Sequence, residues 1–139
     1  MIKTILLLFI MSNFLFSDVA LVKKMTGTVE VKRNKKIITI KIGSSLKNGD
    51  IIISKANSSV GIVFDDGSRL SLGEKAILVI KEFKVKPEKN EFNVDMTLKK
   101  GKAVFNSGTV GKLAPESVKF RIPEGVIGIR GTQFAVEVE

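Results

Sequence analysis

The feature that most constrains the fold of this 139-residue chain is an alternation of apolar and polar side chains with a period of two. Successive side chains of a strand point to opposite faces, so the alternation marks strands with one apolar face. From Asp18 onward, 28 Val and Ile stand against 13 Ala and Leu, and β-branched side chains suit pleated surfaces. The pattern predicts an all-β domain over residues 18–139. The clearest alternating segments are 28–32, 59–65, 92–98, 118–122 and 134–139.

Short turn signals separate these segments. The strongest is Asp66-Gly67 between Phe64 and Leu70, because a tight hairpin needs positive φ, which Gly adopts freely and Asp tolerates. We therefore expect short strands of four to eight residues with Gly-rich turns, and an exposed loop over 86–91. The other turn signals are Thr26-Gly27, Asn34-Lys35, Asn48-Gly49-Asp50, Leu72-Gly73-Glu74, Lys100-Gly101, Ser107-Gly108 and Pro123-Glu124-Gly125.

The N-terminus has the pattern of a secretory signal peptide. Lys3 precedes thirteen uncharged, mostly apolar residues that run from Thr4 to Phe16. A bilayer-spanning helix needs roughly 20 apolar residues, and Asp18 blocks an extension of the run. We predict a signal peptide over residues 1–17, cleavage near Ser17, a periplasmic product and no stable membrane span after cleavage. The alternative is a short uncleaved anchor.

Composition excludes most enzyme chemistry. The chain has no Cys, His, Trp or Tyr, which removes thiol nucleophiles, Cys/His zinc sites, Ser-His-Asp triads and imidazole proton transfer. Serine with lysine chemistry remains possible in principle, but no Ser-x-x-Lys sequence lies in a strand-to-helix context. We therefore predict a protein that is not an enzyme and needs no cofactor.

The charge balance points to an anionic partner. Without Lys3 the remaining 22 Lys and Arg exceed the 14 Asp and Glu by eight. A nucleic-acid site would combine such cations with stacking aromatic residues or a recognition helix, and the sequence suggests neither. We expect no nucleic acid as partner, and instead an envelope protein or an anionic envelope polymer.

Two glycine-containing motifs could hold an ion. Asp65-Asp66-Gly67-Ser68 could begin a calcium loop, but it lacks the further acidic ligands, so a plain hairpin is favoured and no metal site is predicted. Gly125, Gly128 and Gly131 have the spacing of a phosphate cradle, but no helix is expected after them. Close-packed turns explain these glycines better.

Arg130 is the most interesting charged residue, because it lies between Gly128 and Gly131 and precedes Thr132. The flanking glycines would let backbone approach the guanidinium from both sides. In the structural interpretation Arg130 bonds carbonyls or pairs with Asp66 or Glu74; in the other it contacts a ligand or partner. The candidate residues, structural or in contact with a partner, are Asp66, Gly67, Gly128, Arg130, Gly131 and Thr132.

Four sequence pieces, in this order, resemble the FecR domain. They are LKNGDIII (46–53), SVGIVFDDGSRLSL (59–72), LKKGKA (98–103) and FRIPEGVIGIRGTQFAV (120–136). The resemblance covers about residues 27–136. It implies an extracytoplasmic all-β module without enzyme activity, described in that family as a flattened, twisted, solenoid-like stack of short strands; a sandwich-like stack is the alternative.

The best-known FecR members are transmembrane regulators that control a sigma factor and sense an outer-membrane transporter. Here the hydrophobic run begins at residue 4 and the sequence stops at Glu139. We therefore expect a stand-alone exported FecR-domain protein. The expected function is non-catalytic binding of a protein or an anionic envelope polymer in the periplasm. The alternative is a sensory component of cell-surface signalling that acts through a separate membrane partner.

Overall fold

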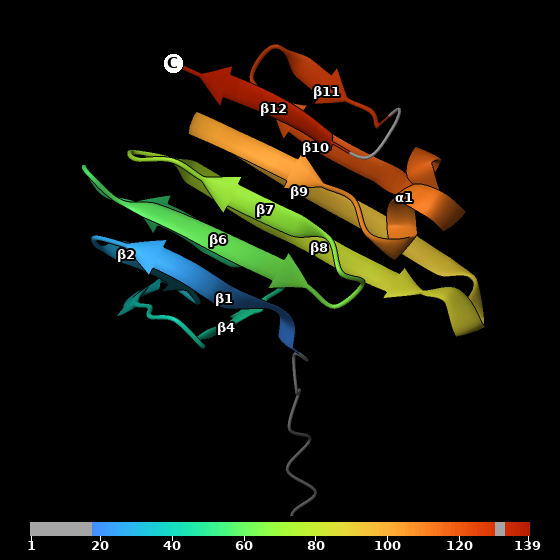
Figure 1. Ribbon diagram of the computed structural model, residues 1–139, viewed down its shortest axis with the longest axis horizontal. Helices are drawn as coiled ribbons and strands as arrows, with labels where there is room; N and C mark the ends of the chain where they lie inside the picture. Colours follow the sequence, from blue (N-terminus) through green and yellow to red (C-terminus); the bar gives the residue numbers. More distant parts are fainter. Residues whose placement is uncertain (1–17, 130–132) are drawn as a thin grey trace, which may run out of the picture.

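A computed structural model describes residues 18–129 and 133–139 of the chain, and it confirms the predicted all-β fold (Figure 1). Strands dominate, and the helices are three to five residues long. The strands are β1 Asp18–Thr26, β2 Val29–Arg33, β3 Lys36–Thr39, β4 Ser45–Lys47, β5 Ile51–Ser54, β6 Ser59–Phe64, β7 Arg69–Leu72, β8 Ile77–Lys86, β9 Glu91–Asn106, β10 Val118–Ile122, β11 Gly125–Ile127 and β12 Gln133–Val138. The helices are η1 Pro87–Lys89, α1 Thr109–Leu113 and η2 Pro115–Ser117.

The strands form one curled sheet whose main path is β3-β2-β5-β8-β9-β7-β6-β1-β4. Every pairing is antiparallel except that of β9 with β10, and β12 adds to β9 beside β10. The curl produces two layers. We call β4, β1, β6, β7, β12 and the second half of β9 the front layer, and β3, β2, β5, β8, β10, β11 and the first half of β9 the rear layer. In Figure 1, β7 lies in front of β8.

The 16-residue strand β9 belongs to both layers. Its first half pairs with β8 and β10, and its second half pairs with β7 and β12. Gly101 lies where the strand passes between layers, at φ +96°. The expected turn at Lys100-Gly101 is therefore wrong, because β9 continues through these residues. The expected strand length of four to eight residues is also exceeded by β1, β8 and β9, whereas β4 and β11 fall short of it.

The core lies between the two layers. Phe64 of β6 stacks on Phe83 of β8 with ring centroids 4.2 Å apart, which joins front to rear. Phe120 of β10 packs against Phe105 and Phe134 of the front layer at 6.4 and 5.0 Å. Aromatic pairs in such offset and edge geometries add to the free energy gained by burial. The predicted alternation is confirmed in β6, where Val60, Ile62 and Phe64 are buried and the residues between them are partly exposed.

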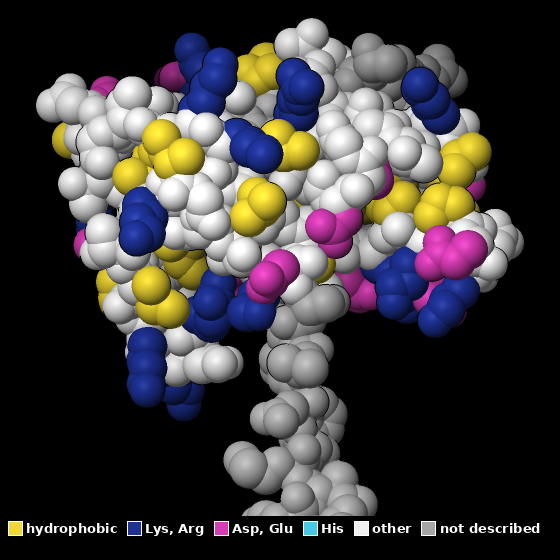
Figure 2. Space-filling model, turned by 60° about the horizontal axis from the view of Figure 1, so that its bottom comes forward, with side chains coloured by type: hydrophobic (Ala, Val, Ile, Leu, Met, Phe, Trp, Pro, Cys, Tyr) yellow, Lys and Arg dark blue, Asp and Glu magenta, His cyan; other side chains and the backbone are white. Residues whose placement is uncertain are grey.

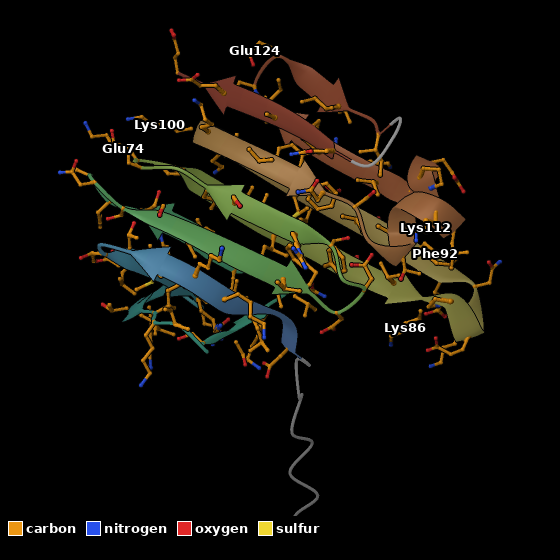
Figure 3. All side chains as sticks on the ribbon, viewed as in Figure 1. Glu74, Lys86, Phe92, Lys100, Lys112 and Glu124 are labelled. Carbon is orange, nitrogen blue, oxygen red and sulfur yellow. The ribbon has the colours of Figure 1, made fainter. Side chains whose placement is uncertain are left out.

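The predicted turns at Asn34-Lys35 and Asp66-Gly67 are confirmed. Asn34 and Lys35 have φ of 51° and 63° and join β2 to β3, while Gly67 has φ +85° and joins β6 to β7. The segment 86–91 is an exposed connection that contains η1. In Figure 3, Lys86, Phe92 and Lys112 lie at one end of the layers, and Glu74 and Lys100 lie at the other.

Candidate functional site: a basic groove on the front layer

A shallow, open groove of about 520 Å³ crosses the outer face of the front layer. β1 contributes Lys23 and Lys24, and β7 contributes Arg69. The rest of the lining is a mixture of apolar residues from β6 and β7 with Gly61, Ser71 and Asn106. Figure 2 shows Lys and Arg side chains spread over one side of the molecule, with hydrophobic side chains between them. The full lining is Lys23, Lys24, Gly61, Ile62, Val63, Arg69, Leu70, Ser71 and Asn106.

A bulge in β1 places two consecutive lysines on the same exposed surface. The register of β1 against β6 shifts between Val22, which pairs with Ile62, and Lys24, which pairs with Gly61. Regular alternation would turn only one of Lys23 and Lys24 outward, yet both are exposed. A bulge inserts one extra residue into a strand and redirects its side chains. Two lysine side chains instead of one therefore lie at this point of the groove.

Gly61, which has no side chain, lies in the floor of the groove. A Cβ atom placed on Gly61 would come within 3.4 Å of the Lys24 Cβ. The aliphatic stem of Lys24 therefore lies across the glycine, in the way that long cationic side chains cover a surface while the charged end stays in water. Across the strands, Gly61 is level with Ser71 and Val104. At this level the lining thus includes the Gly61 backbone and the Ser71 hydroxyl, beside the apolar residues Val63 and Leu70.

The groove is cationic because Lys23, Lys24 and Arg69 line it, while none of the described lining residues carries a carboxylate. Among the described residues, none of the ion pairs uses Lys23, Lys24 or Arg69. These three charges are therefore available to an external anion. Exposed charges attract a polyanion mainly through their summed potential, which salt screens.

Acidic residues bound the groove at one end. Asp18 and Asp65 line a neighbouring depression that shares Lys23 and Val63 with the groove. A hydrogen bond from Lys47 lowers the pKa of Asp18. Burial raises the pKa of Asp65, and the negative charges of Asp18 and Asp66 add to this effect. The carboxylates of Asp18 and Asp65 thus lie beside Lys23 at this end of the groove, where Asp18 is paired with Lys47.

The predicted residues Asp66 and Gly67 lie outside this groove and organise a turn. The Asp66 carboxylate accepts hydrogen bonds from the Ser68 N–H at 2.8 Å and the Val110 N–H at 3.0 Å. The Asp66 carbonyl accepts from the Thr109 N–H at 3.0 Å, and buried Ser68 Oγ accepts from the Gly108 N–H at 2.8 Å. Asp66 therefore caps the start of α1 from a turn more than forty residues earlier. Within the described residues no cluster of acidic groups could hold a metal ion.

Replacing Asp66 by asparagine should lower the free energy of unfolding by about 1–2 kcal/mol, because an amide NH₂ would face one of the two N–H groups.

The matched control is Asp65→Asn. The raised pKa of Asp65 means that its charge opposes folding above the ordinary carboxyl value of 3.8. Asp65→Asn should therefore leave stability at pH 7 unchanged or raised, and the gain should vanish below that pH. Urea unfolding of both variants at pH 7 and pH 3 measures this, and equal effects at pH 7 would contradict the capping role.

Of the other predicted residues, the structure describes Gly128 alone. Gly128 follows β11, and a Cβ atom on Gly128 or Gly125 would meet no described atom within 4 Å, so the expected close packing at these glycines stays a prediction. Arg130, Gly131 and Thr132 lie outside the described residues. Of the carboxylates suggested for Arg130, Asp66 has the partners given above, and Glu74 accepts the Asn57 N–H at 2.7 Å.

The residues of the groove are not among those predicted from the sequence. Lys23, Lys24 and Arg69 come from strands that are far apart in sequence, and scattered lysines resemble an ordinary solvated face. A local signal is the pair of consecutive lysines that follows the apolar run from Val19 to Val22, because a regular strand would place only one of them on each face.

One of the comparisons with known proteins identifies a family. The FecR protein family model matches residues 50–139, so it starts later than the resemblance drawn from residues 27–136. No curated protein and no solved structure matches. Among the described residues, no helix is long and apolar enough to cross a membrane. The FecR family is a regulatory domain family associated with cell-surface signalling, and it is not a known enzyme family. Because the match covers more than half of its length, this chain belongs to the FecR family.

Proposed function

We propose that this chain is a non-catalytic, exported FecR-domain module whose basic groove binds an anionic polymer of the cell envelope in the periplasm. The observation that carries the proposal is the set of three cations, Lys23, Lys24 and Arg69, in a groove whose lining contains no carboxylate. The groove is shallow and open, which suits an extended chain with repeated charges better than a compact ligand.

The chemistry of the groove favours carboxylate or phosphate groups. Arg69 presents a planar fork that can bind either group through two hydrogen bonds, and lysine ammonium groups add point charges. Ser71 and Asn106 add neutral donors beside them. Exposed contacts of this kind contribute about 0.2–1 kcal/mol each, so affinity should come from many repeats along the polymer.

Binding should fall when the groove loses its charge. We expect the triple variant Lys23→Gln, Lys24→Gln, Arg69→Gln to bind fluorescein-labelled polygalacturonate roughly 10-fold or more weakly, since three contacts of about 0.5–1 kcal/mol disappear. The measurement is fluorescence anisotropy at about 0.05 and 0.5 M salt, where the Debye length falls from roughly 14 to 4 Å. Affinity of the wild-type protein should fall steeply between these two conditions.

The matched control removes the same number of charges from the rear layer. Lys32, Lys81 and Lys119 are exposed there, and their replacement by Gln should change binding less than about twofold. Equal losses in the two triple variants would show that net charge alone attracts the polymer and would contradict a site in the groove. Absence of wild-type binding to polygalacturonate and to polyphosphate would contradict the proposed function itself.

The proposal requires export. The apolar run before Ser17 supports cleavage there, and the cleaved product is residues 18–139, which begin at β1. Intact mass of the protein recovered from the periplasmic fraction tests this. A mass that includes residues 1–17 would favour a membrane-anchored form instead.

Membership of the FecR family favours a second candidate, a sensory component of cell-surface signalling that acts through a separate membrane partner. Crosslinking in whole cells at two salt concentrations separates the candidates. A polymer-binding module should lose its partner at high salt, whereas a regulator should recover the same membrane protein at both.

A further inference from the structure

The rear layer ends in an exposed strand whose outer edge is unpaired within the described residues. β3 pairs with β2 alone, and all four of its residues are exposed. Ile37 and Ile38 are 57% and 39% exposed, which is unusual for isoleucine. An apolar strand with an unpaired edge is a template on which another strand can add.

The backbone pattern shows which groups β3 offers. The two-residue turn at Asn34 and Lys35 and the bond from the Ile40 N–H to the Val29 carbonyl set the hydrogen-bonded pairs of the β2–β3 hairpin. Because such pairs alternate along an antiparallel ladder, Ile37 and Thr39 direct their N–H and C=O groups away from β2.

The front layer ends in β4 on one side and, on the other, in β12, a strand of the opposite charge to β3. β12 pairs with β9 alone among the described strands, and Glu137 lies exposed on it with Glu139 just beyond. Figure 1 shows β12 at the top of the molecule and β2, the neighbour of β3, near the bottom, so β3 and β12 of one copy lie apart.

The charges on these two edges select one kind of pairing. Lys35, Lys36 and Lys41 are exposed around β3, so two β3 edges repel each other, and two β12 edges repel through their glutamates. Only β3 against β12 brings opposite charges together. Lysines on an edge strand commonly prevent nonspecific pairing with other strands. Here they favour pairing with an acidic strand.

We infer that the occupant of the β3 edge is β12 of a second copy of this chain. The contact joins two different surfaces, so it repeats from copy to copy and builds open head-to-tail chains or a ring. One added strand buries less area than a standard interface, so association is weak and concentration-dependent. This inference goes beyond the proposed function and does not require a polymer ligand.

Sedimentation velocity of protein purified from cells that express the full chain tests the inference, over a wide concentration range at low salt. The wild-type protein should associate with rising concentration. Lys36→Glu and Glu137→Lys should each shift association to roughly tenfold higher concentration, because each variant sets like charges against each other. An equimolar mixture of the two variants should recover association, since the new carboxylate on β3 of one variant then faces the new ammonium group on β12 of the other.

The control variant is Lys112→Glu on α1. It changes a charge away from both strand edges, so it should have no effect on association (Figure 3).

A separate variant tests the strand edge itself. Thr39→Pro removes an outward N–H without removing a bond to β2, and it should abolish association while circular dichroism shows the wild-type fold. A wild-type protein that stays monomeric at every concentration would overturn the inference. So would a mixture that does not recover association, or a folded Thr39→Pro variant that associates normally. None of these outcomes depends on polymer binding, which is measured separately.

Discussion

Gly101→Ala should lower the free energy of unfolding by about 3–5 kcal/mol. Two effects add. The residue has φ +96°, where a side chain is strained, and the new Cβ would lie 2.6 Å from both Cα and Cβ of Ala76. Ala76 is fully buried, so it has little room to move away from the new methyl group.

Gly43→Ala provides the matched control. Gly43 has φ +91°, but its Cβ would meet no described atom within 4 Å, so this variant reports backbone strain alone, about 1 kcal/mol. Urea unfolding of both variants gives the packing contribution by difference. Adding Ala76→Gly to Gly101→Ala should restore part of the loss. Equal effects at the two glycines would contradict the close approach of β9 to Ala76.

Asp50→Ala should cost about 3 kcal/mol, because it leaves buried polar groups without partners. Asp50 is fully buried and accepts hydrogen bonds from Arg33 Nε at 2.8 Å and Arg33 Nη2 at 2.7 Å. It also accepts the Lys47 N–H at 2.8 Å. The hydrogen bonds with Asp50 raise the pKa of the Arg33 guanidinium, against the opposing effect of burial. The pair joins β2 to the turn before β5.

A second Arg–Asp pair offers the comparison. Arg121 of β10 binds Asp95 of β9 through Nε at 2.9 Å and Nη2 at 3.3 Å, and its side chain is 39% exposed, against 26% for Arg33. Asp95→Ala should therefore cost less than about half as much, since water can reach the Arg121 guanidinium. Chemical denaturation of the two variants measures the difference, and a larger loss at Asp95 would contradict this ranking.

Local patterns in the sequence are enough to assign the clearest alternating segments to strands and to tell which face such a segment buries. The alternation in 59–64 places Val60, Ile62 and Phe64 inside because side-chain direction along a strand is a local property of the backbone. The turns at Asn34-Lys35 and Asp66-Gly67 are equally local, because each needs only a residue type that tolerates positive φ. The net positive charge likewise follows from residue counts.

Which residues act together depends on the tertiary structure. Gly101 looks like a turn in sequence, but the pairing of β9 with β7 and β12 keeps the strand continuous and turns the glycine into a packing contact with Ala76. Asp66 caps a helix start forty-four residues away at Val110. Lys23, Lys24 and Arg69 form a groove because a bulge and the strand order bring them together. Each of these depends on register between distant strands, which local backbone preferences do not specify.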